Sequence, residues 1–147
     1  MKHLRYDPYR AAPEAMEAVF ALNKYVEGCG LDRTLLELVK IRASQINGCA
    51  FCLHMHSRDA RTHGESDARM LLLSAWRESP LYDARERAAL AWTEALTLIS
   101  ETYAPDAVYE EARSHFNEAE LVKLTVAIGL INALNRLAIS FRNVHPA

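Results

Sequence analysis

Four residues between positions 37 and 56 have side chains that together could carry out redox chemistry. Cys49 and Cys52 form a Cys-x-x-Cys pair, His56 lies four residues after Cys52, and Glu37 lies twelve residues before Cys49. Two cysteines at this spacing can interconvert between a dithiol and a disulfide. A histidine can take a proton from a thiol, and a carboxylate can receive or relay that proton. The stretch therefore predicts a dithiol redox site.

Helical geometry indicates how these side chains relate to one another. Asn47-Gly48 is a strong turn signal, so we expect one helix to end before it and another to begin at about Cys49. On the second helix, Cys52 and His56 lie roughly 60° and roughly 20° from Cys49 around the axis, so the three share a face. Cys52 and His56 are i,i+4 neighbours and can meet directly. Cys49 lies about 10.5 Å from His56 along the axis, which is too far for direct contact.

The thiolate is the reactive form of cysteine, so a redox cysteine needs a lowered pKa. Cys49 lies near a helix N-terminus, where unpaired N–H groups favour an anion. Cys52 has His56 one turn away as a proton acceptor. Glu37 has two interpretations. It is either a surface glutamate paired with Lys40 or Arg33, or the carboxylate that faces His56 across the turn, directly or through water.

Zinc binding and a purely structural role are the competing interpretations of the cysteine pair. A structural zinc site needs four ligands, and Cys49, Cys52 and His56 supply three. His63 lies about 10.5 Å beyond His56 on the helix, and His54 points roughly 140° away from Cys49. Neither completes a tetrahedron, and the chain has no second Cys-x-x-Cys pair.

The surrounding elements are predicted to be helical. Glycine and proline are scarce, and no stretch alternates with a period of two residues. After an extended lead-in over residues 1–12, the expected helices cover about 13–27, 33–46, 49–63, 67–79, 84–101, 105–116 and 121–140. Asp83 with Glu86 and Asn117 with Glu120 are typical of capping boxes. We therefore expect one all-α domain over 1–147, of about seven helices, with the cysteine pair at the N-terminus of a central helix.

Composition and charge narrow the class of protein. The chain has 147 residues, half of them apolar, and a net charge of −2, which favours neither nucleic acid nor an anionic membrane as partner. The N-terminal residues lack the apolar run of a signal peptide. Polar residues interrupt the most apolar stretch, 121–139, so we expect a buried helix there rather than a membrane span. Three cysteines in such a chain suggest a cytoplasmic protein with reactive thiols; we expect Cys29 to be a small residue near a helix end.

The spacing Glu-x11-Cys-x2-Cys-x3-His, occupied by Glu37, Cys49, Cys52 and His56, resembles the core signature of the alkylhydroperoxidase D-like (AhpD-like) family. That family is part of the carboxymuconolactone decarboxylase superfamily. The flanking sequence ELVKIRASQINGCAFCLHMHSRDAR is similar to the core segment of the family, and AIGLINALNRLAISFR is similar to the segment that packs against it. The resemblance covers roughly residues 30–142.

The resemblance implies an all-helical protein that assembles into trimers or hexamers. It also implies a peroxidase in which Cys52 attacks the peroxide, Cys49 is the more exposed resolving cysteine, and Glu37 and His56 form a proton relay. The partners would be a hydroperoxide and an external dithiol or thiol-protein reductant. No metal or organic cofactor is required, because the dithiol carries two electrons.

Two features set limits to the resemblance. The prototype peroxidase has a histidine between its cysteines, where this chain has Ala50-Phe51; Phe51 makes the mouth of the site more apolar. The decarboxylase branch of the superfamily lacks the cysteine pair, which disfavours that activity. Two other functions stay open: a disulfide reductase or thiol-exchange protein, and a non-catalytic redox sensor.

Overall fold

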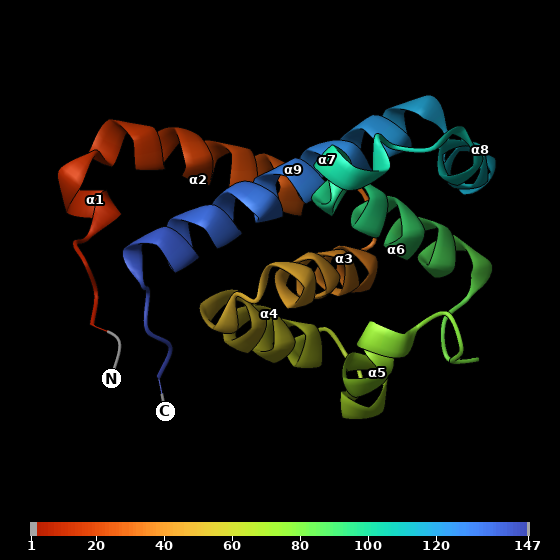
Figure 1. Cartoon of the computed structure of the whole chain (residues 1–147), viewed down its shortest axis with the longest axis horizontal. Coiled ribbons are helices and arrows are strands. Elements are labelled where there is room, and N and C mark those ends of the chain that lie inside the picture. The colour runs from red at the N-terminus through yellow and green to blue at the C-terminus, as the bar shows by residue number, and fades with distance from the viewer. Residues whose placement is uncertain (1–2, 147) are drawn as a thin grey trace.

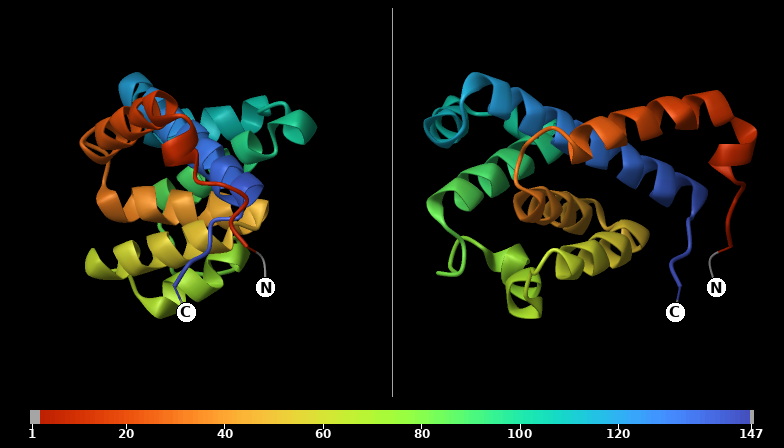
Figure 2. Two further views of the ribbon diagram at one scale, coloured as in Figure 1. Left: turned by 90° about the vertical axis from the view of Figure 1, so that its left-hand side faces the viewer. Right: turned by 180° about the vertical axis from the view of Figure 1, so that it is seen from behind.

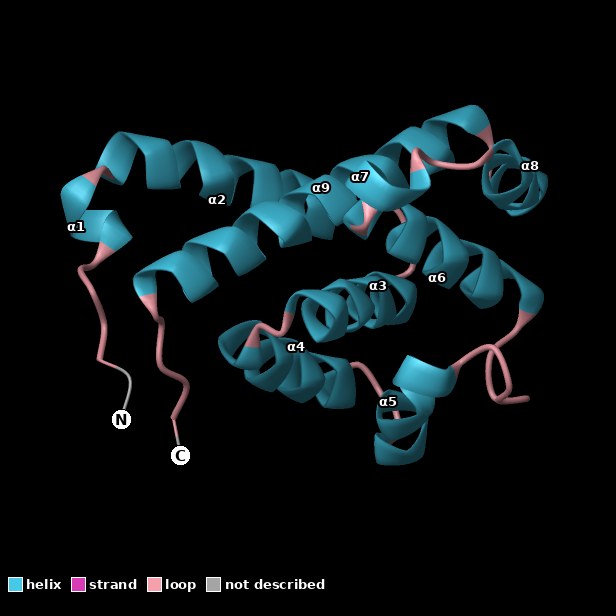
Figure 3. Cartoon of the chain, viewed as in Figure 1, coloured by secondary structure: helices cyan, strands magenta, loops and turns pink. Residues whose placement is uncertain are grey.

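The computed structural model describes residues 3–146 and shows helices without strands over that range, which confirms the all-α prediction (Figure 3). Nine α-helices and one 3-10 helix are present in the described residues, where about seven helices were expected. In chain order they are α1 (Pro8–Ala11), α2 (Pro13–Glu27), α3 (Arg33–Asn47), α4 (Ala50–Thr62), α5 (Asp67–Leu72), η1 (Leu73–Ala75), α6 (Ala84–Thr97), α7 (Ile99–Thr102), α8 (Asp106–His115) and α9 (Glu118–Phe141).

The additional elements are one short helix in the lead-in and two places where a longer predicted helix is interrupted. Asp7 accepts a hydrogen bond from the Tyr9 N–H and starts the short α1, so the lead-in is not wholly extended. Residues 1–2 of that lead-in lie outside the described residues. The expected 84–101 helix ends at Thr97 because the backbone of Leu98 leaves the helical conformation, and α7 follows. The expected 67–79 helix ends as α-helix at Leu72 and tightens into η1.

Side-chain caps start three of the longer helices, α3, α6 and α9, and those of α6 and α9 are the predicted ones. The Asp32 side chain accepts a hydrogen bond from the Leu35 N–H at the start of α3. Both predicted capping boxes are present, at the start of α6 and at the start of α9. These local signals therefore determine where the main helices begin.

The most enclosed helix is α3, and the helix with the cysteine pair, α4, packs against it. α3 contacts α4, α6 and α9, and it is buried along most of its length, from Leu35 to Ser44. Figures 1 and 2 show α9 crossing the long dimension of the molecule, with α2 beside it and the α3–α4 hairpin below. The N-terminal lead-in returns to the end of α9, where the Arg5 N–H donates to the Phe141 carbonyl.

α9 is long and apolar enough to cross a membrane by length and composition alone. In the structure its apolar side packs against α2, α3 and α6 and contributes Leu124, Ile128 and Ile131 to the interior. Two polar residues on the same helix, Asn132 and Asn135, also have hydrogen-bond partners inside the molecule. α9 is therefore a core helix of this bundle.

Candidate active site

The α3–α4 turn positions the two halves of the candidate site. Gly48 ends α3 in the left-handed conformation, with φ of 71°, and its N–H donates to the Gln45 carbonyl. Glycine adopts this conformation without the steric cost that other residues meet. The turn makes α3 and α4 antiparallel neighbours, so Glu37 on α3 comes to face His56 on α4. Of the two interpretations of Glu37, the structure shows the contact with His56 across the turn.

Glu37, His56 and Lys40 form a buried polar cluster. The Glu37 Oε2 atom lies 2.9 Å from His56 Nδ1, and Glu37 Oε1 lies 3.1 Å from Lys40 Nζ. All three residues are buried. Burial raises the pKa of Glu37, but the hydrogen bond from His56 and the charges of His56 and Lys40 outweigh it, so the pKa lies below its ordinary value. Glu37 is therefore a carboxylate, and it has both partners that the sequence left as alternatives, His56 and Lys40.

The carboxylate determines which nitrogen of His56 is available for chemistry. An ionised carboxylate can only accept hydrogen bonds, so Nδ1 of His56 carries the proton that it shares with Glu37. The other ring nitrogen, Nε2, is buried and has no hydrogen-bond partner among the described residues. A buried ring nitrogen without a partner is costly, and at this position it is available to exchange a proton with a bound molecule or a thiol.

The two cysteines are free thiols that interact with each other. Cys49 is the N-cap of α4, and its sulfur accepts a hydrogen bond from the Cys52 N–H at 3.4 Å. The two sulfur atoms are 2.6 Å apart. The hydrogen bond from the Cys52 thiol lowers the pKa of Cys49 to about 7, in spite of burial. The same bond and burial raise the pKa of Cys52. Near neutral pH Cys49 is therefore about half ionised, while Cys52 keeps its proton.

One expected contact is missing and one expected difference in exposure is wrong. No hydrogen bond joins Cys52 to His56 in the described residues, because Cys52 interacts with Cys49 and His56 with Glu37. We expected Cys49 to be the more exposed cysteine, but Cys49 is 1% exposed and Cys52 is 2% exposed. Cys49 is enclosed because its position as N-cap places it between the start of α4 and the side of α9, where it packs near Ile131 and Ala138.

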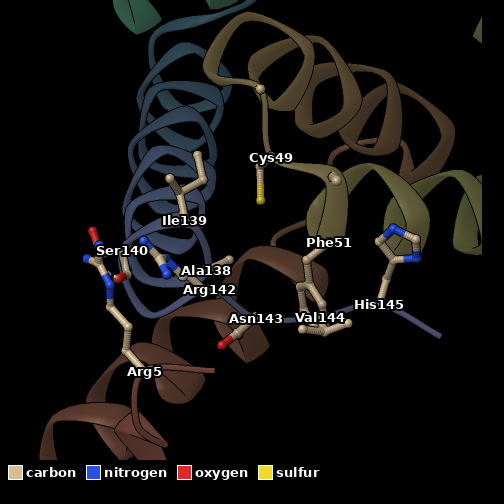
Figure 4. A pocket seen from close by; sticks show the side chains of 12 residues that line it. Arg5, Cys49, Phe51, Ala138, Ile139, Ser140, Arg142, Asn143, Val144 and His145 are labelled. Carbon is tan, nitrogen blue, oxygen red and sulfur yellow. Dashed lines mark hydrogen bonds between the residues drawn. The ribbon is translucent and has the colours of Figure 1, made fainter. Parts of the chain in front are cut away.

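The two cysteines border different cavities. Cys52 lines a cavity of about 220 Å³ together with Glu37, Lys40 and His56. Apolar side chains of α1, α2 and α9 complete its wall, among them Tyr9, Met16, Phe20, Leu134 and Leu137. Cys49 lines a separate cavity of about 680 Å³ between the start of α4, the end of α9 and the C-terminal tail (Figure 4). The cysteine pair thus lies between two spaces that a substrate and a reductant could occupy.

Sequence reasoning missed two residues of the site and most of its wall. Lys40 appeared only as a partner for a surface glutamate, yet it is buried. Asn135 is fully buried on α9, and its side-chain amide helps to lower the pKa of Cys49. It also bonds Ser44 and Asn47, with the Ser44 Oγ at 3.0 Å, and so links α9 to the α3–α4 turn. The polar interruption of an apolar helix was the one signal that could have singled out Asn135.

The remaining sequence candidates lie outside the cluster. Cys29 is buried in the core beside Val26 and Leu31, as expected for a small residue after a helix end. His54 is stacked on His145 near the surface, and His63 is the C-cap of α4. Within residues 3–146, no group of three or more histidine, cysteine or acidic side chains is placed to hold a metal ion.

Comparisons with known proteins identify a family and several similar proteins. The family model for carboxymuconolactone decarboxylases matches residues 13–95. The uncharacterised protein YdfG of Bacillus subtilis is 42% identical over 139 residues, which cover 95% of each chain. A crystal structure of a protein of unknown function from Agrobacterium tumefaciens, described as a candidate antioxidant defence protein AhpD, is 50% identical, covers 99% of each chain and has a TM-score of 0.96. A peroxidase-related protein from a Silicibacter species is 26% identical, with a TM-score of 0.83 over 95% of this chain and 74% of that one.

Proposed function

Because the chain belongs to the carboxymuconolactone decarboxylase family and is AhpD-like in sequence and fold, we propose that it is a thiol-dependent peroxidase that reduces organic hydroperoxides. The observation that carries the proposal is the shared cavity of Cys52 and His56. In that cavity a thiol, a buried imidazole nitrogen without a partner and a carboxylate that orients the imidazole surround one small space. This is the set of groups that a proton-coupled attack on a peroxide requires.

The proposed cycle begins at Cys52. The Cys52 proton moves to His56 Nε2, and the resulting thiolate attacks one oxygen of the hydroperoxide. The O–O bond breaks, Cys52 becomes a sulfenic acid, and the alkoxide takes the proton from His56 and leaves as an alcohol. The Cys49 thiolate then attacks the Cys52 sulfur, which forms the disulfide and releases hydroxide, and the hydroxide takes a proton from the solvent to become water. An external dithiol returns both cysteines to the thiol form.

The lower pKa of Cys49 fits this division of roles. The resolving cysteine attacks as a thiolate, and in the resting dithiol a pKa of about 7 keeps about half of Cys49 ionised at neutral pH. Cys52 is assigned the attack because it lines the same cavity as His56, whereas Cys49 does not. The apolar wall from α1, α2 and α9 suits an alkyl chain on the hydroperoxide.

Disulfide exchange is the second candidate function. A cysteine of lowered pKa at a helix N-terminus is also the feature that thiol-exchange proteins use. The two functions differ in the oxidant: the peroxidase consumes hydroperoxide, whereas the exchange protein consumes disulfides. A redox sensor would be oxidised once without turnover.

Turnover with a supplied dithiol tests the proposal. We expect repeated consumption of cumene hydroperoxide with dithiothreitol as donor, and mass mapping should find one disulfide, between Cys49 and Cys52, with Cys29 free. Cys29→Ala is the matched control, because it removes the third cysteine without touching the cavity. A single oxidation without turnover, or a disulfide that includes Cys29, would contradict the proposal.

A further inference from the structure

The larger cavity, at Cys49, differs in charge from the smaller one at Cys52. Two arginines, Arg5 and Arg142, line the Cys49 cavity, and none of its lining residues is acidic. The Cys52 cavity is lined by three acidic residues, Glu27, Glu37 and Asp59, and by one lysine, Lys40, which is paired with Glu37. The chain as a whole has a net charge of −2, whereas this cavity is lined by basic residues and no carboxylate. An anion is therefore attracted to the Cys49 cavity and repelled from the Cys52 cavity.

The arginines are available to a ligand. The Arg142 guanidinium has no hydrogen bond or ion pair with residues 3–146, and Arg5 uses one nitrogen to donate to the Ser140 carbonyl at 3.0 Å. Both residues are exposed. Figure 4 shows the Cys49 sulfur pointing into the cavity, with Arg142 and Arg5 on the side of α9. Two arginines that line the same cavity as a reactive sulfur, with no acidic residue in its lining, match the charge of a carboxylate.

We propose that this cavity is the binding site of the electron donor, and that the donor is a small thiol bearing a carboxylate, which Arg5 and Arg142 hold while the thiol attacks Cys49. The proposal rests on the peroxidase function proposed above and names the donor class for the same dithiol. The burial of Cys49 at the inner end of a cavity of about 680 Å³ favours a slender small molecule over a folded protein as donor.

The chemistry is a pair of thiol–disulfide exchanges. The donor thiolate attacks the Cys49 sulfur of the Cys49–Cys52 disulfide, a donor–Cys49 bond forms, and Cys52 leaves as a thiolate on the side of His56. A second donor thiolate, or the second thiol of a dithiol donor, attacks the donor sulfur and releases the Cys49 thiolate. The donor loses two electrons and becomes a disulfide, the protein disulfide gains them, and two protons pass from the donor thiols to the solvent and the cysteines.

Dihydrolipoate and its neutral amide provide a matched pair of probes. Their two thiols are the same, and only the carboxylate, five carbon atoms away, differs. The protein is first oxidised with diamide, so that the measurement needs no peroxide turnover. Each donor is then added at pH 7, and the gain of thiols on Cys49 and Cys52 is followed by alkylating samples at intervals and weighing the protein by mass spectrometry. We expect the carboxylate to reduce the disulfide about three- to tenfold faster than the amide, with a ratio that falls as salt is added.

Variants that remove the charge of one arginine test whether Arg5 and Arg142 cause the difference between the two donors. Arg142→Gln and Arg5→Gln should each lower the ratio of the two rates, and the double variant should bring it to about one. Arg136→Gln is the matched control, because Arg136 is an exposed arginine on the same helix that borders a different cavity. It should leave the ratio unchanged.

The outcomes separate the two proposals. Failure of diamide to form the Cys49–Cys52 disulfide would contradict the peroxidase function. Normal disulfide formation with equal rates for the two donors, or a ratio that the arginine variants do not change, would overturn the donor site alone. Reduction by a dithiol attached to a protein domain, with neither small donor reacting, would overturn it as well.

Discussion

At the scale of single residues, the position of one proton governs the site. The pair of sulfurs, 2.6 Å apart, shares the Cys52 thiol proton, and Glu37 orients His56 so that Nε2 can receive it. The acidic cysteine of the resting site and the cysteine that meets the substrate are therefore different residues. Three predictions follow from this difference.

The roles of the cysteines can be separated by trapping. Cys52→Ser should abolish both oxidation and turnover, because the attacking sulfur is gone. Cys49→Ser should react once and leave a sulfenic acid on Cys52, because no thiol is present to resolve it. Dimedone labelling with mass mapping measures this. A sulfenic acid on Cys49 in Cys52→Ser, with none on Cys52 in Cys49→Ser, would reverse the assignment.

The proton relay predicts large effects on rate at neutral pH. His56→Ala and Glu37→Gln should slow the oxidation of Cys52 by about 10²–10⁴-fold, because the thiol loses its proton acceptor or the group that orients it. Part of the rate should return at high pH, where Cys52 ionises without help. Stopped-flow measurement of oxidation against pH tests this, with His54→Ala as the control on the same helix. Equal losses at neutral and high pH would argue for a purely structural role.

The pKa of Cys49 predicts the pH dependence of alkylation. The folded pKa is lowered to about 7, so Cys49 should be mostly thiolate above pH 7 and should lose reactivity as pH falls through 7. Cys52→Ala removes the thiol donor and should shift the midpoint upward. Iodoacetamide labelling of Cys49, followed by mass spectrometry, gives the midpoint. An unchanged midpoint in Cys52→Ala would mean that the N-terminus of α4, and not Cys52, stabilises the thiolate.

At the scale of elements, the α3–α4 turn is the feature on which the site depends. Gly48 has φ of 71° and nothing within 4 Å of the position that a Cβ would take, so a substitution there meets backbone strain and no clash. Gly129, in the middle of α9, also has open space around it but lies in ordinary helical backbone. The two glycines therefore form a matched pair.

Alanine substitutions at these glycines should have opposite effects on stability. Gly48→Ala should lower the free energy of unfolding by about 1–2 kcal/mol, because alanine is strained in the left-handed region. Gly129→Ala should raise it by about 0.5–1 kcal/mol, because alanine restricts the unfolded chain and favours the helix. Urea unfolding of both variants measures the difference. Destabilisation of equal size at both positions would show that crowding, and not backbone conformation, limits these sites.

At the scale of the whole molecule, the N-terminal part has apolar side chains that the single chain leaves exposed. Tyr6, Phe20 and Tyr25 are each about half exposed, on the lead-in and on α2. Larger exposed apolar areas are typical of surfaces that meet another protein. We propose that they pack against further copies of the chain, in a trimer or hexamer.

Sedimentation at micromolar concentration tests assembly. We expect a homo-oligomer, and Tyr25→Asp should weaken it, because a carboxylate would be buried at the contact. Lys24→Gln, at the neighbouring exposed position, is the control and should leave the assembly intact. A monomer over the whole concentration range would contradict assembly through this surface.

The sequence by itself determined the helical fold, and it singled out Glu37, Cys49, Cys52 and His56 as the candidate site residues. The helix starts follow from capping side chains such as Asp83 and Asn117, and the place of Cys49 as N-cap follows from the turn at Gly48. These features depend on hydrogen bonds between residues within a few positions of one another, and such local bonds can be predicted from the sequence.

Only the tertiary structure decided how the site is arranged in space. The hydrogen bond between Glu37 and His56, the amide of Asn135 beside the cysteines and the apolar wall from α1 and α2 join segments far apart in the chain. The lowered pKa of Cys49 and the opposite charge of the two cavities depend on these long-range contacts. Burial and electrostatic effects are set by every neighbour in space, whatever its distance along the chain, and periodicity and spacing do not contain that information.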